Sequence, residues 1–232
     1  MRIRKTNDYS TETVNCGVYG YAGTGKTTLI RTLPCEPGEI VIVSCESGLL
    51  PLRDLSITSI ECGSKGDVND AYQWLCESDE SRGIKWVAFD SMSEIAEVVL
   101  AEEKGKTKDG RKAYGETIEI MTKMIRTFRD LPGRNCFYTF KAENVNDDSK
   151  LLRGPSMPGN KLAQSVPYFF DFLLALRSHT DFENEKEDKS QVKRWLQCQP
   201  DGVWEAKDRS GCLGLYEPPS IEQIYNKIKG KN

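Results

Sequence analysis

The segment from Gly20 to Thr28 constrains the fold of this chain more than any other part of it. It reads Gly-Tyr-Ala-Gly-Thr-Gly-Lys-Thr-Thr and follows an apolar run, and its spacing is that of a phosphate-binding loop. Glycines at Gly20, Gly23 and Gly25 let the backbone curl so that successive N–H groups point inward at an anion. Such a loop joins a buried strand to a helix, whose positive end also faces the phosphates. The sequence therefore predicts an α/β fold.

Three residues after the glycines carry the predicted contacts to a nucleoside triphosphate. Lys26 supplies a cation to the β- and γ-phosphates, and the Thr27 hydroxyl is a ligand of the Mg²⁺ that bridges them. Thr28 offers a further hydroxyl near the α-phosphate. The expected nucleotide-binding residues are Gly20, Ala22, Gly23, Thr24, Gly25, Lys26, Thr27 and Thr28. The predicted cofactors are ATP and Mg²⁺.

Composition disfavours several other classes of protein. No apolar run approaches the roughly 20 residues of a membrane helix, and the first residues lack the apolar segment of a signal peptide. We therefore expect a cytoplasmic protein with no membrane partner. The 8 cysteines are never spaced as Cys-x-x-Cys, which favours buried, reduced thiols over zinc ligands. Because the net charge is −3, any contact with nucleic acid must come from local basic segments.

The apolar segments alternate between strand-like and helix-like patterns, as in a mostly parallel sheet flanked by helices. Near-continuous apolar runs predict buried strands at Val14–Tyr19, Ile40–Cys45, Ile57–Glu61, Trp86–Asp90, Cys136–Phe140 and Phe172–Arg177. Helices are predicted at Lys26–Thr32, Asp67–Glu77, Ser93–Glu103, Gly115–Leu131 and Pro219–Ile228. Val192–Gln197 and Val203–Lys207 predict an antiparallel extension. We expect a single domain over residues 1–232, with a core at 13–178 and the extension and C-terminal helix at 179–232.

Two acidic residues follow strands that are predicted to end at the same edge of the sheet, where ligands of such folds bind. Asp90 ends a strand expected beside the loop strand, which is the position of a Walker B carboxylate that organises Mg²⁺. Ser91 or Ser93 is expected to cap the next helix. Glu46 follows the second strand, and a carboxylate there can deprotonate the water that attacks the γ-phosphorus. Glu46 is therefore the predicted general base; the alternatives are a helix-capping aspartate and a solvent-exposed glutamate.

A glutamate after the second strand, with Asp90 followed by Ser91 instead of a second acid, resembles the RecA-like branch of P-loop ATPases. Within that branch the chain resembles the phage ATPases of the Sak group of single-strand annealing proteins, often labelled phage nucleotide-binding or AAA-family proteins. The motifs that carry the resemblance are the phosphate loop, Glu46-Ser-Gly48, Asp90-Ser91, Tyr114-Gly115, Met157-Pro-Gly159 and Ala206-Lys-Asp-Arg-Ser-Gly211. The resemblance implies DNA-stimulated ATP hydrolysis, single-stranded DNA as partner, and recombination or annealing for a phage in a bacterial cytoplasm. A single-strand-binding protein would be a further partner.

The resemblance also implies two segments that contact DNA. The position of the first RecA-type DNA loop holds Lys104, Lys106, Lys108, Arg111 and Lys112, with Tyr114 as a stacking face. The second is expected in Lys141–Lys161, a long irregular span that holds Lys150, Arg153 and Lys161. The alternatives are a solvated linker for the first segment, and a nucleotide lid or subunit contact for the second. Lys141 stands where RecA proteins have a glutamine that senses the γ-phosphate.

Lys207 and Arg209 resemble the Lys-x-Arg pair that RecA-fold ring ATPases of the KaiC and DnaB type project into a neighbour's nucleotide site. In that role they would stabilise charge on the γ-phosphate in trans, as catalytic residues beside Lys26 and Glu46, and the chain would form a ring or a filament. The alternative is a β-turn with exposed charges. Two other functions stay open: a P-loop phosphotransferase, and a KaiC-like regulatory ATPase with protein partners and no DNA.

Overall fold

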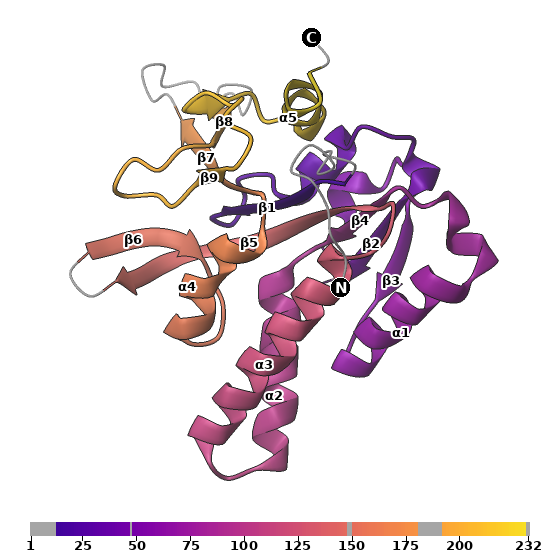
Figure 1. Ribbon diagram of the computed structural model, residues 1–232, viewed down its shortest axis with the longest axis vertical. Helices are drawn as coiled ribbons and strands as arrows, with labels where there is room; N and C mark the ends of the chain where they lie inside the picture. Colours follow the sequence, from indigo (N-terminus) through magenta and orange to yellow (C-terminus); the bar gives the residue numbers. More distant parts are fainter. Residues whose placement is uncertain (1–12, 47, 148–149, 181–191, 231–232) are drawn as a thin grey trace, which may run out of the picture.

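The computed structural model describes residues 13–46, 48–147, 150–180 and 192–230 (Figure 1). The strands are β1 (Asn15–Gly20), β2 (Ile40–Ser44), β3 (Thr58–Glu61), β4 (Trp86–Phe89), β5 (Asn135–Asp147), β6 (Lys150–Pro155), β7 (Phe172–Thr180), β8 (Val192–Gln197), β9 (Lys207–Asp208) and β10 (Tyr216–Glu217). The α-helices are α1 (Lys65–Glu77), α2 (Met92–Lys106), α3 (Gly110–Arg129), α4 (Asn160–Phe169) and α5 (Ile221–Ile228). Short 3-10 helices are η2 (Thr27–Thr32), η3 (Pro37–Glu39), η4 (Leu50–Leu52) and η5 (Asp79–Gly83).

The strands form a sheet in the order β10-β8-β7-β1-β5-β4-β2-β3. The six strands from β7 to β3 pair in parallel, while β8 and β9 pair antiparallel with β7, and β10 with β8. The prediction of a mostly parallel α/β sheet with an antiparallel C-terminal extension is therefore confirmed. One detail is wrong: β5 lies between β1 and β4, so the strand that ends at Asp90 is not the neighbour of the loop strand.

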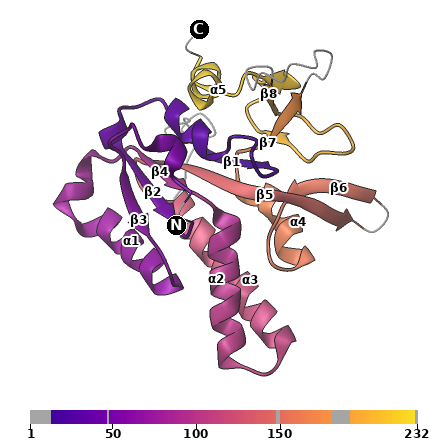
Figure 2. The ribbon, with the colours of Figure 1, turned by 180° about the vertical axis from the view of Figure 1, so that it is seen from behind.

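Helices cover both faces of the sheet, because the parallel strands carry apolar side chains on both sides (Figure 2). On one face the buried side chains of α1, α2, α3 and α4 form a single core with the sheet, and this core includes the predicted α3 positions Met121, Ile125 and Phe128. On the other face η2 and α5 pack through residues such as Ile30 and Ile224. No helix in the described ranges combines the length and the apolar character needed to cross a membrane.

The first segment predicted to contact DNA is helical, not a long loop. Helix α2 continues to Lys106 and α3 begins at Gly110, so the two helices form a hairpin that extends beyond the sheet (Figure 1). The side chain of Asp109 caps α3 by accepting hydrogen bonds from the N–H groups of Arg111 and Lys112. Asp109 could have indicated the start of α3 from the sequence, because an aspartate before a helix accepts hydrogen bonds from the free N–H groups of the first helical turn.

The expectation of an irregular span at Lys141–Lys161 is also wrong. β5 continues to Asp147 and pairs antiparallel with β6, and α4 begins at Asn160. The expected strand at Val203–Lys207 is reduced to β9 and an isolated bridge between Arg153 and Trp204. These segments are polar, so no apolar run marks them as strands, and their structure depends on pairing with a partner strand.

The cysteines do not form disulfides, as the sequence predicts, but not all of them are buried. Four are buried, two are half-buried, and Cys76 and Cys212 are exposed. Burial raises the pKa of the Cys136 thiol to about 12, so this thiol stays protonated at neutral pH.

Candidate nucleotide site

The phosphate loop is tightly curled at the carboxyl end of β1. Gly23 and Gly25 have φ of 75° and 101°, which glycine adopts without strain. At Gly20 a Cβ atom would lie 2.8 Å from the carbonyl oxygen of Leu176, so only glycine fits there. The Thr24 hydroxyl donates to the carbonyl oxygen of Tyr21 at 2.8 Å and closes the curl. These contacts give the loop the shape that the sequence predicts.

The element after the loop is the 3-10 helix η2 instead of the α-helix predicted from Lys26. It begins at Thr27 and has six residues. The N–H of Leu29 lies between two acceptors, the carbonyl oxygens of Gly25 at 3.2 Å and Lys26 at 3.1 Å. Thr27 and Thr28 are β-branched and have low α-helix propensity, so this short element keeps the tighter 3-10 geometry over its whole length.

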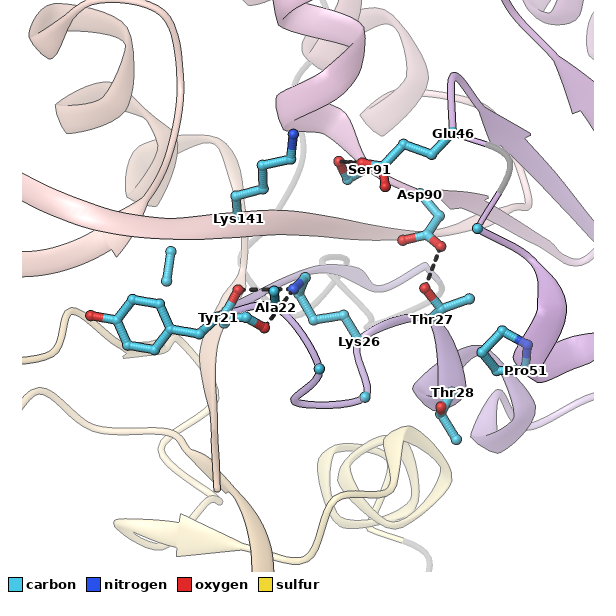
Figure 3. A pocket seen from close by; sticks show the side chains of 15 residues that line it. Tyr21, Ala22, Lys26, Thr27, Thr28, Glu46, Pro51, Asp90, Ser91 and Lys141 are labelled. Carbon is cyan, nitrogen blue, oxygen red and sulfur yellow. Dashed lines mark hydrogen bonds between the residues drawn. The ribbon is translucent and has the colours of Figure 1, made fainter. Parts of the chain in front are cut away.

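The loop lines one wall of a cleft of about 550 Å³ (Figure 3). Seven of the eight expected nucleotide-binding residues line this cleft, whereas Thr24 is buried in the loop. The other walls come from the segments after β2 and β4, the middle of β5, and Pro51 in η4. The cleft has the volume of a small-molecule site.

Lys26 bends back over its own loop. Its ammonium group donates hydrogen bonds to the carbonyl oxygens of Gly20 and Tyr21, both at 2.9 Å. Burial lowers the pKa of Lys26, although Asp90 and Glu46 oppose this effect and Lys141 adds to it. A half-buried cation at the base of a phosphate loop is suited to exchange these carbonyl partners for phosphate oxygens.

Asp90 is buried between two hydroxyl groups. Its Oδ2 accepts a hydrogen bond from Thr27 Oγ1 at 2.7 Å, and its Oδ1 accepts one from Thr139 Oγ1 at 2.6 Å. The structure therefore brings together the two residues that are predicted to bind the metal. Hydroxyl and carboxylate oxygens are the hard ligands that Mg²⁺ prefers, so this pair fits the ion. Sequence reasoning missed the contact of Thr139 with Asp90. A single polar residue within the apolar part of β5 was the signal that could have indicated this contact.

Glu46 lies at the same edge of the sheet as Asp90, because β2 and β4 are neighbours paired at Val43 and Phe89. The Ser91 hydroxyl donates to Glu46 Oε1 at 2.6 Å. Ser91 is also the N-cap of α2, and its Oγ accepts a hydrogen bond from the N–H of Glu94. The Ser91 hydroxyl, at the start of α2, thus orients the carboxylate of Glu46. Glu46 itself is exposed and lines the cleft (Figure 3). Its role as general base stays a prediction.

Lys141 is a second cation that lines the cleft. It pairs with Gly20 in the register of β5 and β1. Its ammonium group forms an ion pair with Glu94 on α2, and this hydrogen bond raises the pKa of Lys141. Its backbone N–H donates to the Ser93 hydroxyl at 3.0 Å. The middle of β5 is therefore attached to the start of α2.

Lys207 and Arg209 do not lie in the nucleotide cleft of their own chain. Lys207 donates to the carbonyl oxygens of Pro167 and Phe170, both at 2.9 Å, and Arg209 donates to Asp171 at 2.6 Å. The N–H of Arg209 also donates to the carbonyl oxygen of Asp171, whose N–H donates to Asn15 at the start of β1. The loop follows the other end of β1, about 16 Å along the strand. A role in trans stays a prediction.

The residues predicted to contact DNA are only partly brought together. All five basic residues of the first segment are exposed at the α2–α3 hairpin, and the ammonium group of Lys104 lies 5.3 Å from the centre of the Tyr114 ring. Tyr114 lies against Gly159, where a Cβ would be 3.5 Å from its Cδ1, next to the exposed Lys161.

Arg153 lies in a different environment, with its guanidinium 5.1 Å from the centre of the Trp204 ring. The side chain of Lys150 lies outside the described part of the structure. The hairpin tip is about 22 Å from the cleft along α2. Because Tyr114 lies against Gly159, the two predicted DNA segments meet at Tyr114 and Lys161, and this surface is away from the nucleotide cleft.

Sequence reasoning also missed Arg194 on β8. Its Nε donates to the carbonyl oxygen of Thr24 in the phosphate loop at 3.0 Å. The two residues are 170 positions apart in the sequence, so no local pattern indicates this contact.

Comparison with known proteins agrees with this geometry. The model of a family described as AAA domain matches residues 12–210, a range that includes the phosphate loop, Glu46, Asp90 and β8. A search of curated proteins found no match. The family is of the P-loop ATPase type, which indicates a nucleotide-binding protein. Because the match extends over most of the sequence, the chain belongs to the AAA domain family.

Proposed function

We propose that this protein is a RecA-like, Mg²⁺-dependent ATPase that binds single-stranded DNA and acts in phage recombination or strand annealing. The ATPase part is supported above all by one observation: Thr27 and Asp90 are hydrogen-bonded at 2.7 Å in the cleft that Lys26 and Glu46 also line. A phosphate loop, a pair of metal ligands and a carboxylate base are the parts that ATP hydrolysis requires.

In this proposal the loop amides and Lys26 bind the triphosphate. Thr27 and Asp90 would hold Mg²⁺, which would supply positive charge to stabilise the phosphate oxygens. Glu46, oriented by Ser91, accepts a proton from the attacking water while the new bond from its oxygen to the γ-phosphorus forms. The bond from the γ-phosphorus to the ADP oxygen breaks, and ADP and inorganic phosphate leave. Phosphoryl transfer depends mainly on positioning and on charge stabilisation, and Lys207 and Arg209 of a neighbouring copy would add charge stabilisation to these groups.

The RecA-like part is supported by the placement of Glu46 after a strand that is the neighbour of the strand before Asp90, with Ser91 in place of a second acid. The DNA part rests on the family resemblance and on the exposed basic residues around Tyr114, where an aromatic face accompanies cations. Assembly into a ring or filament rests on Lys207 and Arg209.

The test is steady-state ATP turnover with and without single-stranded DNA, at low and at physiological salt. We expect turnover that DNA stimulates and that salt suppresses, because phosphate contacts release counterions. Turnover indifferent to DNA would remove the DNA part and leave a regulatory ATPase. Transfer of phosphate to a nucleotide or metabolite acceptor would instead indicate a phosphotransferase.

Glu46→Gln tests the chemistry in the same assay. Losing a general base should lower kcat by about 10²–10⁴-fold and leave ATP affinity nearly unchanged. Glu61→Gln is the matched control, since Glu61 ends the adjacent strand β3 and does not line the cleft. Equal activity of the Glu46→Gln and Glu61→Gln variants would show that Glu46 is not the base.

A further inference from the structure

The phosphate loop contacts the C-terminal extension at two of its residues. Arg194 on β8 binds the carbonyl oxygen of Thr24, and the ring of Tyr21 meets the ring of Trp204 edge-on, with centres 5.7 Å apart. Trp204 is itself buried against the guanidinium groups of Arg153 and Arg177, each 5.1 Å from its ring. Two residues of the C-terminal extension, Arg194 and Trp204, thus contact the loop at Thr24 and at Tyr21.

The Arg194 contact has a defined consequence for the loop. A peptide unit is planar and trans, so its C=O and N–H groups point in opposite directions. The carbonyl oxygen of Thr24 and the N–H of Gly25 belong to the same peptide unit. A guanidinium that holds this oxygen on the outer side of the loop therefore directs the N–H of Gly25 toward the inner side, where the phosphates of a nucleotide bind.

The packing around Gly25 agrees with this role. A Cβ on Gly25 would lie 3.7 Å from Nε and 3.8 Å from Cδ of Arg194, so the arginine side chain covers the outside of this residue. Arg194 reaches the loop because β8 pairs antiparallel with β7, which is the parallel neighbour of β1. The family match ends at residue 210 and includes β8, so this strand is part of the shared domain.

We infer that Arg194 is a positioning residue of the nucleotide site, which acts within its own chain by holding the Thr24–Gly25 peptide in its phosphate-binding orientation. It adds to the loop's own glycines a support from the far end of the sequence. The kinetic part of this inference rests on the proposed ATPase function. The structural part does not, because the contact joins two parts of the chain itself.

The kinetic test compares Arg194→Ala, Arg194→Lys and Lys193→Ala. The Arg194→Ala variant loses a hydrogen bond from a charged donor, so we expect KM for ATP to rise about 10-fold. We expect kcat to change by less than about 2-fold, because the Gly25 N–H serves substrate and transition state alike. Arg194→Lys should restore much of the affinity. Lys193→Ala, on the opposite face of β8, should match the wild type.

Hydrogen exchange of the nucleotide-free protein tests the same inference without hydrolysis. In Arg194→Ala the amides of Thr24 and Leu29, which donate hydrogen bonds to the carbonyl oxygens of Tyr21 and Gly25, should exchange faster, while amides in the middle of α3 should keep their wild-type rates. Should the alanine variant fail to fold, Arg194→Lys and Arg194→Gln allow the same comparison, with slower loop exchange expected for lysine.

The outcomes separate this inference from the proposed function. A wild-type protein that does not hydrolyse ATP contradicts the proposed function, while faster loop exchange in Arg194→Ala would still support Arg194 as a positioning residue. Unchanged loop exchange with unchanged KM would overturn the inference even if the protein is an active ATPase. A loss of kcat at constant KM would also overturn it, since Arg194 would then act on the transition state.

Discussion

At the scale of single residues, Asp90 joins three strands of the sheet at one carboxylate. It follows β4, accepts a hydrogen bond from Thr27 after β1, and accepts another from Thr139 on β5. It is buried, with 6% of its surface exposed. A carboxylate held by two hydroxyl groups has little freedom to move, which lowers the entropic cost of forming a metal site.

Asp90→Asn should separate metal binding from nucleotide binding. The amide has the shape of the carboxylate but lacks its charge, so we expect the affinity for ATP in the presence of Mg²⁺ to fall by about 10-fold or more. Affinity in the presence of EDTA should change by less than about 3-fold, since the loop and Lys26 are unaltered. Calorimetric titration measures both. Asp54→Asn, an exposed residue paired with Arg31, is the control, and equal Mg²⁺ dependence of the Asp90→Asn variant and wild type would contradict the assignment.

At the scale of elements, an ion-pair cluster joins α1 to α2. Glu103 on α2 accepts from Lys65 of α1 at 2.6 Å and from Lys106 at 2.7 Å. Its side chain is nearly buried although its partners are partly exposed. The hydrogen bonds from Lys106 and Lys65 lower the pKa of Glu103 below its ordinary 4.5.

This lowered pKa makes a prediction about stability and pH. Because Glu103 has a lower pKa when folded than when unfolded, its pairing stabilises the fold fully above about pH 4.5 and is lost as the pH falls through the folded pKa. The difference in unfolding free energy between wild type and Glu103→Gln should therefore be largest near neutral pH and shrink in acid. Urea titrations at several pH values measure it. A difference that stays constant with pH would show that the charge of Glu103 is unimportant.

The α2–α3 hairpin makes a separate prediction about DNA. Replacing Lys108 and Arg111 together with alanine should weaken binding of single-stranded DNA for all sequences alike, because phosphate contacts carry no base information. The slope of log affinity against log salt should become shallower by about 0.7 for each lost contact. Lys123→Ala is the control, because Lys123 lies on α3 but away from the tip of the hairpin. Unchanged affinity and slope in the double variant would place DNA elsewhere or exclude it.

At the scale of the whole molecule, the nucleotide cleft and the Lys207–Arg209 pair lie at opposite edges of the sheet. A role of this pair in trans would require a head-to-tail assembly in which the pair faces the cleft of the next copy. Within one chain Arg209 is paired with Asp171, so contact with a neighbour's phosphates requires exchange of that partner.

Mixing two inactive variants tests this arrangement. Arg209→Ala retains an intact phosphate loop, and Lys26→Ala retains an intact Arg209. If Arg209 acts in trans, mixed assemblies contain interfaces with both parts, and turnover should recover to a substantial fraction of the wild-type rate. Light scattering checks that mixed assemblies form. Mixed assemblies without recovery would show that Arg209 has no role at a neighbour's site.

Much of the site could be predicted because its information is local. The phosphate loop depends on glycine spacing within one turn, and the strands that end near Glu46 and Asp90 are continuous apolar runs. Ser91 caps α2 as expected. The helical hairpin at residues 104–112 was missed although Asp109 signalled its second helix, because charged residues there have no apolar periodicity.

The sequence alone specified the phosphate loop, the parallel sheet and the residues that meet at its edge, since local spacing and burial on both faces are properties of single segments. The β5–β6 hairpin, the insertion of β5 between β1 and β4, and the Arg194 contact with Thr24 came from packing. The hairpin joins polar segments that are neighbours in the chain, whereas the other two features depend on hydrogen bonds between segments far apart in the chain. Such partners become available only when the whole sheet has formed, because isolated polar segments gain too little from their own residues to offset the entropy of ordering.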